Sequence, residues 1–232
     1  MILTLPELVD RYRFPVGSVL HLGARLGEER DEYDAVGARE ITWVEADPDV
    51  CAELAEAIDR PGHRVVQAVV SDADDVEVDF HVASNRSSSS ILTMKLHTEA
   101  HPEAVVTGTK RLMTTTVDTL CARAAITQPD LLVLDLQGAE LLALRGATWT
   151  LAAVAALYTE VSIVELYEGG VLIGDLDDFL AGFARVETVM TPFGWGDALY
   201  LPRRLVTPGM SPRHWFSPVK GRVEPIEVPP PT

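Results

Sequence analysis

Short apolar runs alternate with amphipathic segments along the first 200 residues of the chain. Apolar runs predict buried strands, and segments with apolar residues three or four positions apart predict helices. The predicted strands are residues 18–22, 41–45, 65–70, 130–136 and 154–161, and the predicted helices are 28–36, 48–59, 138–145 and 175–183. Because strands that alternate with helices form a parallel sheet covered on both faces, the pattern predicts a doubly wound α/β domain.

The end of this region departs from the alternation. Residues 186–190 and 198–201 are both predicted strands, and only residues 191–197 connect them. A parallel crossover needs about a dozen residues or more, so these two strands must run antiparallel. The sequence therefore predicts a Rossmann-like, mostly parallel sheet of seven strands with an antiparallel C-terminal hairpin.

Two other segments do not follow the alternation of strands and helices. Residues 76–83 alternate with period two, which predicts an exposed or edge strand, whereas residues 84–116 are polar and show no clear periodicity. Eight of the 15 prolines fall in residues 202–232. We therefore expect one domain over residues 1–201, followed by a proline-rich arm over 202–232. The arm would lie on this domain or on a neighbouring subunit, which would make the protein a homodimer.

Composition excludes several classes of partner. The chain has 232 residues, which suits a single large core, and a formal net charge of −16. Such a surface repels the phosphates of nucleic acids and anionic lipid head groups. No apolar run approaches the ~20 residues of a membrane span, and the first residues lack a basic leader. We expect a cytoplasmic protein that acts on a small molecule.

A candidate nucleotide site lies at the ends of the first three predicted strands. Gly23 and Gly27 bracket the turn after the first strand, where glycine lets the backbone approach a ligand. Glu45 ends the second strand and suits the hydroxyls of a ribose. Ser71 and Asp72 follow the third strand, where an adenine edge would lie. These features fit a nicotinamide cofactor or S-adenosylmethionine. The antiparallel hairpin, and the lack of a Gly-x-Gly-x-x-Gly motif, favour methyl transfer.

The chain resembles the FkbM family of methyltransferases over nearly the whole span from Val19 to Leu201. The resemblance rests on residues 22–27 (LGARLG), 44–47 (VEAD), 87–92 (SSSSIL), 116–120 (TVDTL), 134–141 (LDLQGAEL), 144–147 (LRGA), 158–161 (YTEV) and 194–200 (GWGDALY). It implies a class I methyltransferase fold, S-adenosylmethionine as methyl donor, and O-methylation of a sugar, polyketide or similar hydroxyl. The cofactor contacts expected on this basis are His21, Gly23, Ala24, Arg25, Gly27, Glu45, Ala46, Val70, Ser71, Asp72, Asp135 and Gln137.

His21 departs from the pattern of the resemblance. The first strand of such methyltransferases often carries an acid at this position, which helps to hold the ammonium group of the cofactor. A neutral histidine accepts the same hydrogen bond, whereas a protonated one repels the cation. His21 is equally compatible with a packed strand residue.

Methyl transfer to an alcohol calls for a general base, because a neutral hydroxyl is a poor nucleophile. We favour His97, which follows the serine run in a long loop and titrates near neutral pH. Asp135 and Glu160 lie near strand ends and are alternative catalytic groups, or ligands of Mg²⁺. We expect no dedicated metal site. Ser88, Ser89, Ser90, His97, Glu160, Trp195 and Asp197 are the expected acceptor-binding residues.

Two other functions stay open at this level. One is a nicotinamide-dependent oxidoreductase on the same fold. The other is a methyltransferase-like domain that binds the cofactor but has lost activity. The identity of the methyl acceptor is not encoded in any motif of the sequence.

Overall fold

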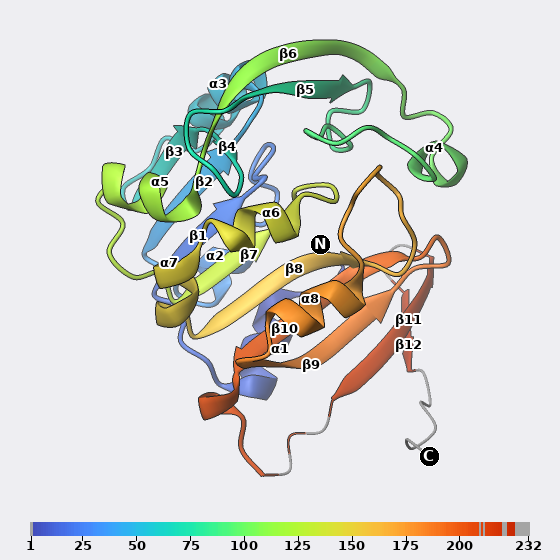
Figure 1. Cartoon of the computed structure of the whole chain (residues 1–232). Helices are drawn as coiled ribbons and strands as arrows, with labels where there is room; N and C mark the ends of the chain where they lie inside the picture. The colour runs from blue at the N-terminus through green and yellow to red at the C-terminus, as the bar shows by residue number, and fades with distance from the viewer. Residues whose placement is uncertain (1, 209, 211, 220–221, 226–232) are drawn as a thin grey trace.

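The computed structural model describes residues 2–208, 210, 212–219 and 222–225 (Figure 1). Most of its strands belong to one large sheet. In chain order these strands are β1 (Ser18–Leu22), β2 (Glu40–Glu45), β3 (His63–Gln67), β7 (Leu131–Leu134), β8 (Ala156–Ser162), β9 (Phe183–Met190), β10 (Trp195–Pro202), β11 (Arg213–Val219) and β12 (Arg222–Pro225). Within the described residues the sheet thus has nine strands, in the spatial order β12-β11-β9-β10-β8-β7-β1-β2-β3.

The parallel part of this sheet and its closing hairpin confirm the predicted fold class. Strands β3, β2, β1, β7 and β8 run parallel, and β10 lies antiparallel between β8 and β9. Each of the seven predicted strands has a counterpart in the sheet. The order of the parallel strands reverses beside β1 and β7, and this is the place where ligands bind in open α/β sheets.

The sheet is wider than predicted because the segment after Pro202 adds two strands. β11 pairs in parallel with β9, and β12 pairs antiparallel with β11 at the edge of the sheet. Proline is tolerated at a sheet edge, where a missing N–H breaks no ladder on the open side. Part of the proline-rich segment therefore pairs with the sheet of its own domain.

Helices cover both faces of the sheet. On one face lie α1 (Leu5–Tyr12), α2 (Arg30–Ala35) and α3 (Pro48–Ala57), and on the other lie α5 (Val117–Arg123), α6 (Glu140–Arg145), α7 (Thr148–Ala153) and α8 (Ile173–Phe179). Successive residues of a strand point to opposite faces. Accordingly Val19 and Leu131 pack in the first core, while Leu20 and Leu132 pack in the second.

A second, three-stranded sheet forms an arch. It contains β4 (Val69–Val70), β6 (Val106–Thr115) and β5 (Glu77–Ala83), in that spatial order. In Figure 1 the arch of β5 and β6 lies at the top of the view and extends toward the short helix α4 (His97–Ala100). Lys110 on β6 pairs with Asp47 at 2.5 Å and with Asp49 at 2.8 Å, which fastens the arch to the start of α3.

The arch accounts for two differences from the predicted elements. The prediction of irregular structure over residues 84–116 was wrong for β6, because most β6 side chains are exposed and so give no apolar alternation. The third strand was predicted as one run over 65–70. It divides after Gln67, since β3 pairs with β2 whereas Val69 and Val70 pair with β6.

Candidate active site

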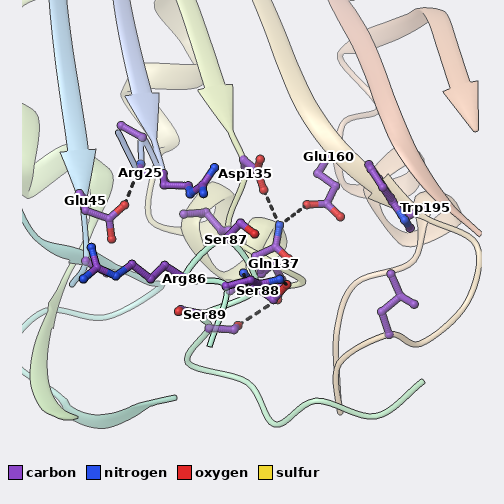
Figure 2. A pocket seen from close by; sticks show the side chains of 18 of the residues that line it. Arg25, Glu45, Arg86, Ser87, Ser88, Ser89, Asp135, Gln137, Glu160 and Trp195 are labelled. Atoms are coloured by element: carbon purple, nitrogen blue, oxygen red, sulfur yellow. Dashed lines mark hydrogen bonds between the residues drawn. The ribbon is translucent and has the colours of Figure 1, made fainter. Parts of the chain in front are cut away.

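A cavity of about 570 Å³ lies at the carboxyl ends of the parallel strands. Its walls come from the turns after β1, β2 and β7, from the ends of β8 and β10, and from the loop that follows β5. Figure 2 shows the side chains from these elements converging on one space, with Glu45 on one side and Trp195 on the other. The cavity is large enough for a nucleoside-sized ligand together with a small second molecule.

The turn after β1 forms one end of the cavity. The backbone N–H groups of Gly23 and Ala24 both donate to the carbonyl oxygen of Val44, which holds the turn against β2. Gly23 has a φ of 81°, and an added Cβ would lie 1.9 Å from the carbonyl oxygen of Asp135. Only glycine fits here, because strands β1 and β7 approach closely at the site.

Glu45 ends β2 with its carboxylate at the same end of the cavity. One oxygen accepts a hydrogen bond from the Arg25 backbone N–H and the other from that of Asp47, each at 2.8 Å. Burial raises the pKa of Glu45, while the N–H donors oppose this rise. The two hydrogen bonds fix the carboxylate at the cavity wall, where it can accept further bonds from a ligand.

The structure brings most of the expected cofactor residues to this cavity, but not all. His21, Gly23, Ala24, Arg25, Glu45, Ala46, Val70, Asp135 and Gln137 line it. Gly27, Ser71 and Asp72 do not. Gly27 has a positive φ, and a Cβ there would lie 2.4 Å from Ile58 Cδ1, so its role is close packing beside α3. The Ser71 N–H donates to the carbonyl oxygen of Thr115, which turns the chain toward the arch and leaves Asp72 exposed.

His21 is buried in the wall behind this turn. Its Nδ1 lies 2.9 Å from the Tyr33 hydroxyl and 4.0 Å from a carboxylate oxygen of Glu29. Its ring also packs against Trp43. Burial lowers the pKa of His21, so the imidazole is neutral at pH 7 and carries no charge that would repel a cation.

Asp135 and Glu160 are bridged by one amide group. Gln137 Nε2 donates to Asp135 Oδ1 at 2.6 Å and to Glu160 Oε2 at 2.7 Å, as the dashed lines in Figure 2 indicate. Burial, together with the nearby charges of Asp135 and Glu140, raises the pKa of Glu160 well above its ordinary value. Glu160 therefore binds a proton more tightly than an isolated glutamate does.

Glu140 holds the loop that carries Gln137. It is buried at the start of α6 and accepts hydrogen bonds from the N–H groups of Leu136 at 2.8 Å and Gly138 at 3.3 Å. Burial raises the pKa of Glu140 to about 7. Its carboxyl group therefore fixes the backbone on both sides of Gln137.

His97 lines the same cavity, and His101 lies beside both the His97 ring and the Trp195 ring. His97 begins α4 and is 5% exposed, and its ring lies beside those of Tyr167 at 5.2 Å and His101 at 5.0 Å. Burial lowers the pKa of His97, and the neighbouring His101 adds to this effect. The imidazole is therefore neutral at pH 7 and can accept a proton.

The serine run lines the cavity, but the hydroxyl groups of Ser88, Ser89 and Ser90 form hydrogen bonds within the protein. Ser88 Oγ accepts from Asn85 Nδ2 at 2.9 Å, and Ser89 Oγ accepts from the Ala83 N–H at 3.0 Å. Ser90 Oγ donates to the carbonyl oxygen of Gln137 at 2.9 Å. These bonds shape the loop around the cavity.

The hairpin between β9 and β10 supplies the remaining wall. Trp195 lines the cavity, as does Asp197, which is buried. The Asp197 carboxylate accepts hydrogen bonds from the Tyr158 hydroxyl at 2.9 Å and from the Ile2 backbone N–H.

Among the lining residues that sequence reasoning missed are Ile2, Arg86, His101 and Phe193. They lie in segments without periodicity, and no sequence signal marks them.

Three buried side-chain atoms have no hydrogen-bond partner among the described residues. They are Arg25 Nε, His97 Nδ1 and Trp195 Nε1. Buried polar groups are rarely left unpaired, because each costs about 1–3 kcal/mol. All three belong to residues that line the cavity.

Two further searches cover the described part of the chain. No group of three or more His, Cys, Asp or Glu side chains there is arranged to hold a metal ion. No helix there has the length and apolar character needed to cross a membrane.

The chain is similar to several known proteins. It is 27% identical over 191 residues to the 2-O-methyltransferase NoeI of Sinorhizobium fredii (strain NBRC 101917 / NGR234), a match that covers 78% of this chain and 77% of that protein. A crystal structure of methyltransferase FkbM from Methylobacillus flagellatus matches 80% of this chain with 14% identity and a TM-score of 0.48, and the chain spans 43% of its length. A putative RNA methyltransferase from Pyrococcus horikoshii matches 84% of this chain, and 80% of its own, with 13% identity and a TM-score of 0.47.

The family comparison covers the cavity and most of the sheet. The model of the methyltransferase FkbM domain matches residues 21–186, which run from the end of β1 into β9. This span contains every cavity residue described above except Ile2 and those of the closing hairpin. The chain belongs to the FkbM methyltransferase family.

Proposed function

We propose that this chain is an S-adenosylmethionine-dependent O-methyltransferase that acts on a hydroxyl of a small metabolite, such as a sugar, a glycoside or a polyketide-like compound. The observation that carries the proposal is the cavity at the carboxyl ends of the parallel strands, which both Glu45 and His97 line. The end of the cavity that contains Glu45 has a carboxylate and apolar side chains, which suit the ribose and the base of a nucleoside. The end that contains His97 has a neutral base and aromatic walls.

The residues present fit the cofactor. The Gly23–Ala24 turn leaves room for the methionine part beside β1, and Glu45 accepts from the ribose hydroxyls. Ala68, Val69 and Val70 line the cavity next to Glu45 and offer an apolar wall for adenine. When bound, S-adenosylmethionine supplies a methyl group activated by the positive charge of its sulfonium.

The charges around the cavity suit a cationic cofactor. Six acidic residues line it, namely Glu28, Glu29, Glu45, Asp135, Glu160 and Asp197. The lining arginines are Arg25 and Arg86, and each is paired with a glutamate, Glu28 and Glu53 respectively. The excess of carboxyl groups attracts positive charge, and it disfavours acceptors that carry phosphate near the reacting hydroxyl.

We assign His97 as the general base. It is neutral at pH 7 because burial lowers its pKa, so it can take the proton of an acceptor hydroxyl. Such assistance contributes roughly 10²–10⁴-fold in rate. Phe193, His101 and Trp195 form an aromatic wall beside it, which suits the apolar face of a small ring compound.

The alternative in which Asp135 and Glu160 hold Mg²⁺ has less support. The Gln137 amide lies between the two carboxyl groups and donates to both, so its N–H₂ occupies the place that a bridging cation would take. Two other predictions stay as they were made. We expect a small-molecule partner rather than nucleic acid or a membrane, and the homodimer stays a prediction.

O-methylation is supported by the relative named 2-O-methyltransferase, at 27% identity. Family membership also favours methyl transfer over the nicotinamide-dependent alternative. Titration calorimetry with S-adenosylhomocysteine, and with NAD as control, tests the cofactor. Saturable binding of the first ligand only is expected, and tighter binding of NAD would refute the proposal.

Turnover requires a second experiment. The protein is incubated with methyl-labelled S-adenosylmethionine and a panel of monosaccharides, glycosides and hydroxylated polyketides, and products are identified by mass spectrometry. A methyl ether is the expected product. Cofactor binding without transfer to any member would instead indicate the alternative of a binding or scaffold domain.

A further inference from the structure

Tyr167 lies behind the wall of the cavity, in the connection between β8 and α8. It is 2% exposed and does not itself line the cavity. Its hydroxyl donates to Gln137 Oε1 at 2.8 Å and lies 3.1 Å from the carbonyl oxygen of Ser88. Its ring lies beside that of His97. One side chain therefore contacts the bridging amide, the serine loop and the general base.

The orientation of the Gln137 amide matters for the two carboxyl groups that it joins. Its nitrogen faces Asp135 Oδ1 and Glu160 Oε2, and its oxygen faces Tyr167. If the amide were turned over, its oxygen would lie within hydrogen-bond distance of both carboxyl groups. Both groups would then need a proton to avoid repulsion between oxygen atoms. In the first orientation the Tyr167 hydroxyl donates to the amide oxygen, and this hydrogen bond helps to hold the amide there.

The backbone conformation at Gln137 is unusual, which indicates that the position of its side chain is fixed. Its φ is 54°, in the left-handed region that residues other than glycine rarely adopt. The Ser90 hydroxyl and Glu140, which accepts from the Leu136 and Gly138 N–H groups, hold the loop in this conformation. Strain of this kind persists only where the surroundings fix it, and it is concentrated at functional sites.

We propose that Tyr167 is a positioning residue, which orients the Gln137 amide so that Asp135 and Glu160 are both kept as hydrogen-bond acceptors at the cavity. This role belongs to the proposed methyltransferase site, and it rests on the proposed function only for the identity of the ligand that the cavity binds. The family resemblance and the cavity lining do not include Tyr167.

The groups that act on Glu160 come from three neighbouring elements. Asp135 follows β7, Glu140 begins α6 and Asp197 lies on β10, and all three are acids that raise its pKa together with burial. The Gln137 N–H₂ group is the neutral donor that opposes them, because hydrogen bonds to a carboxylate favour its charged form. Loss of the Tyr167 hydroxyl removes the hydrogen bond that holds the amide in place, so the donation from Gln137 to Glu160 weakens.

The test is the substitution Tyr167→Phe, which keeps the ring beside His97 and removes only the hydroxyl. The side-chain carboxyl carbons of glutamate are titrated by NMR in the ligand-free protein, with Glu160 assigned from Glu160→Gln. We expect the midpoint of Glu160 to rise by about one pH unit in Tyr167→Phe. An unchanged midpoint would overturn the proposal.

Tyr200→Phe is the matched control. Tyr200 is also buried, and its hydroxyl donates to Asp177 at 2.9 Å instead of to Gln137. It should leave the Glu160 midpoint unchanged. An equal shift in this variant would show that loss of any buried hydroxyl suffices, and would also overturn the proposal.

A double variant shows whether Tyr167 acts through Gln137. Gln137→Met removes the amide, so adding Tyr167→Phe to it should shift the midpoint no further. If Tyr167→Phe raised the Glu160 midpoint as much in the Gln137→Met background as in the parent, Tyr167 would not act through Gln137, and the proposal would be contradicted. These measurements need no ligand. Failure of S-adenosylhomocysteine to bind the parent protein would refute the proposed function, and the titration would still decide the role of Tyr167.

Discussion

Asp197 on β10 lies directly opposite Glu160 on β8 in the antiparallel register. The two acids enter the cavity from neighbouring strands and share the same low-dielectric space. They differ in partners, because Asp197 accepts from Tyr158 and from the Ile2 N–H, whereas Glu160 accepts from Gln137. Asp197 is thereby tied to the N-terminal segment. Glu160, together with Asp135, is coupled to the loop after β7.

Glu45 is the residue on which cofactor affinity should depend. In Glu45→Ala the ribose hydroxyls lose a charged acceptor, which costs about 1.5–3 kcal/mol and lowers the affinity for S-adenosylhomocysteine at least tenfold. Titration calorimetry measures this. Glu40→Ala, at the exposed start of β2, is the control and should bind as the parent does. Unchanged affinity in a folded Glu45→Ala protein would contradict the ribose assignment.

His97 should control the chemical step and not cofactor binding. His97→Ala is expected to lower kcat by roughly 10²–10⁴-fold and to leave the affinity for S-adenosylhomocysteine within about threefold. Steady-state kinetics with the acceptor found by screening, together with calorimetry, check both values. His81→Ala on the arch serves as a control. Full activity of His97→Ala would exclude it as the base.

The pH dependence of the rate gives an independent test of the same residue. The base acts in its neutral form, and burial lowers the pKa of His97 below its ordinary value of 6.5. The kcat of the parent should therefore rise with pH through one ionisation below pH 6.5 and stay level above pH 7. A rate that continues to rise above pH 8 would point to another base.

Glu140 should make stability fall as the pH rises. Its folded pKa is raised to about 7 from 4.5, so the folded state binds the proton more tightly than the unfolded state does. The contribution is fully present below pH 4.5 and is lost as the pH rises through about 7, by an amount on the order of 3 kcal/mol. Urea denaturation at pH 5 and pH 8 measures it. Glu140→Gln should reduce the difference, whereas Glu77→Gln, exposed on β5, should not.

Two truncations separate the parts of the segment after Pro202. Deletion of residues 219–232 removes β12, which pairs with β11 at the sheet edge, and should leave cooperative unfolding and cofactor binding intact. Deletion of 203–232 also removes Trp215, whose indole donates to the fully buried Glu187. Thermal unfolding should show a clear loss of stability in the longer deletion only. Loss of the transition in the shorter one would show that β12 belongs to the core.

The sequence by itself determined the parts of the fold that depend on local patterns. Apolar runs marked the strands of the parallel sheet, and the helix predicted over residues 48–59 begins at Pro48, where the Asp47 side chain accepts from the Asp49 N–H. The short connection of residues 191–197 was enough to require the antiparallel hairpin. Gly23 and Glu45 could be singled out because their roles follow from their positions at strand ends.

Tertiary structure alone decided which chemical groups meet. β6 has few buried side chains, and the strands after Pro202 are interrupted by proline, so neither gives a clear pattern. Asp72 was placed correctly after its strand, but the pairing of Ser71 with Thr115 turns it to solvent. Tyr167 reaches Gln137 and Ser88 from 30 and 79 residues away in the chain. Contacts between such distant residues depend on how the strands and loops pack, and no local periodicity records them.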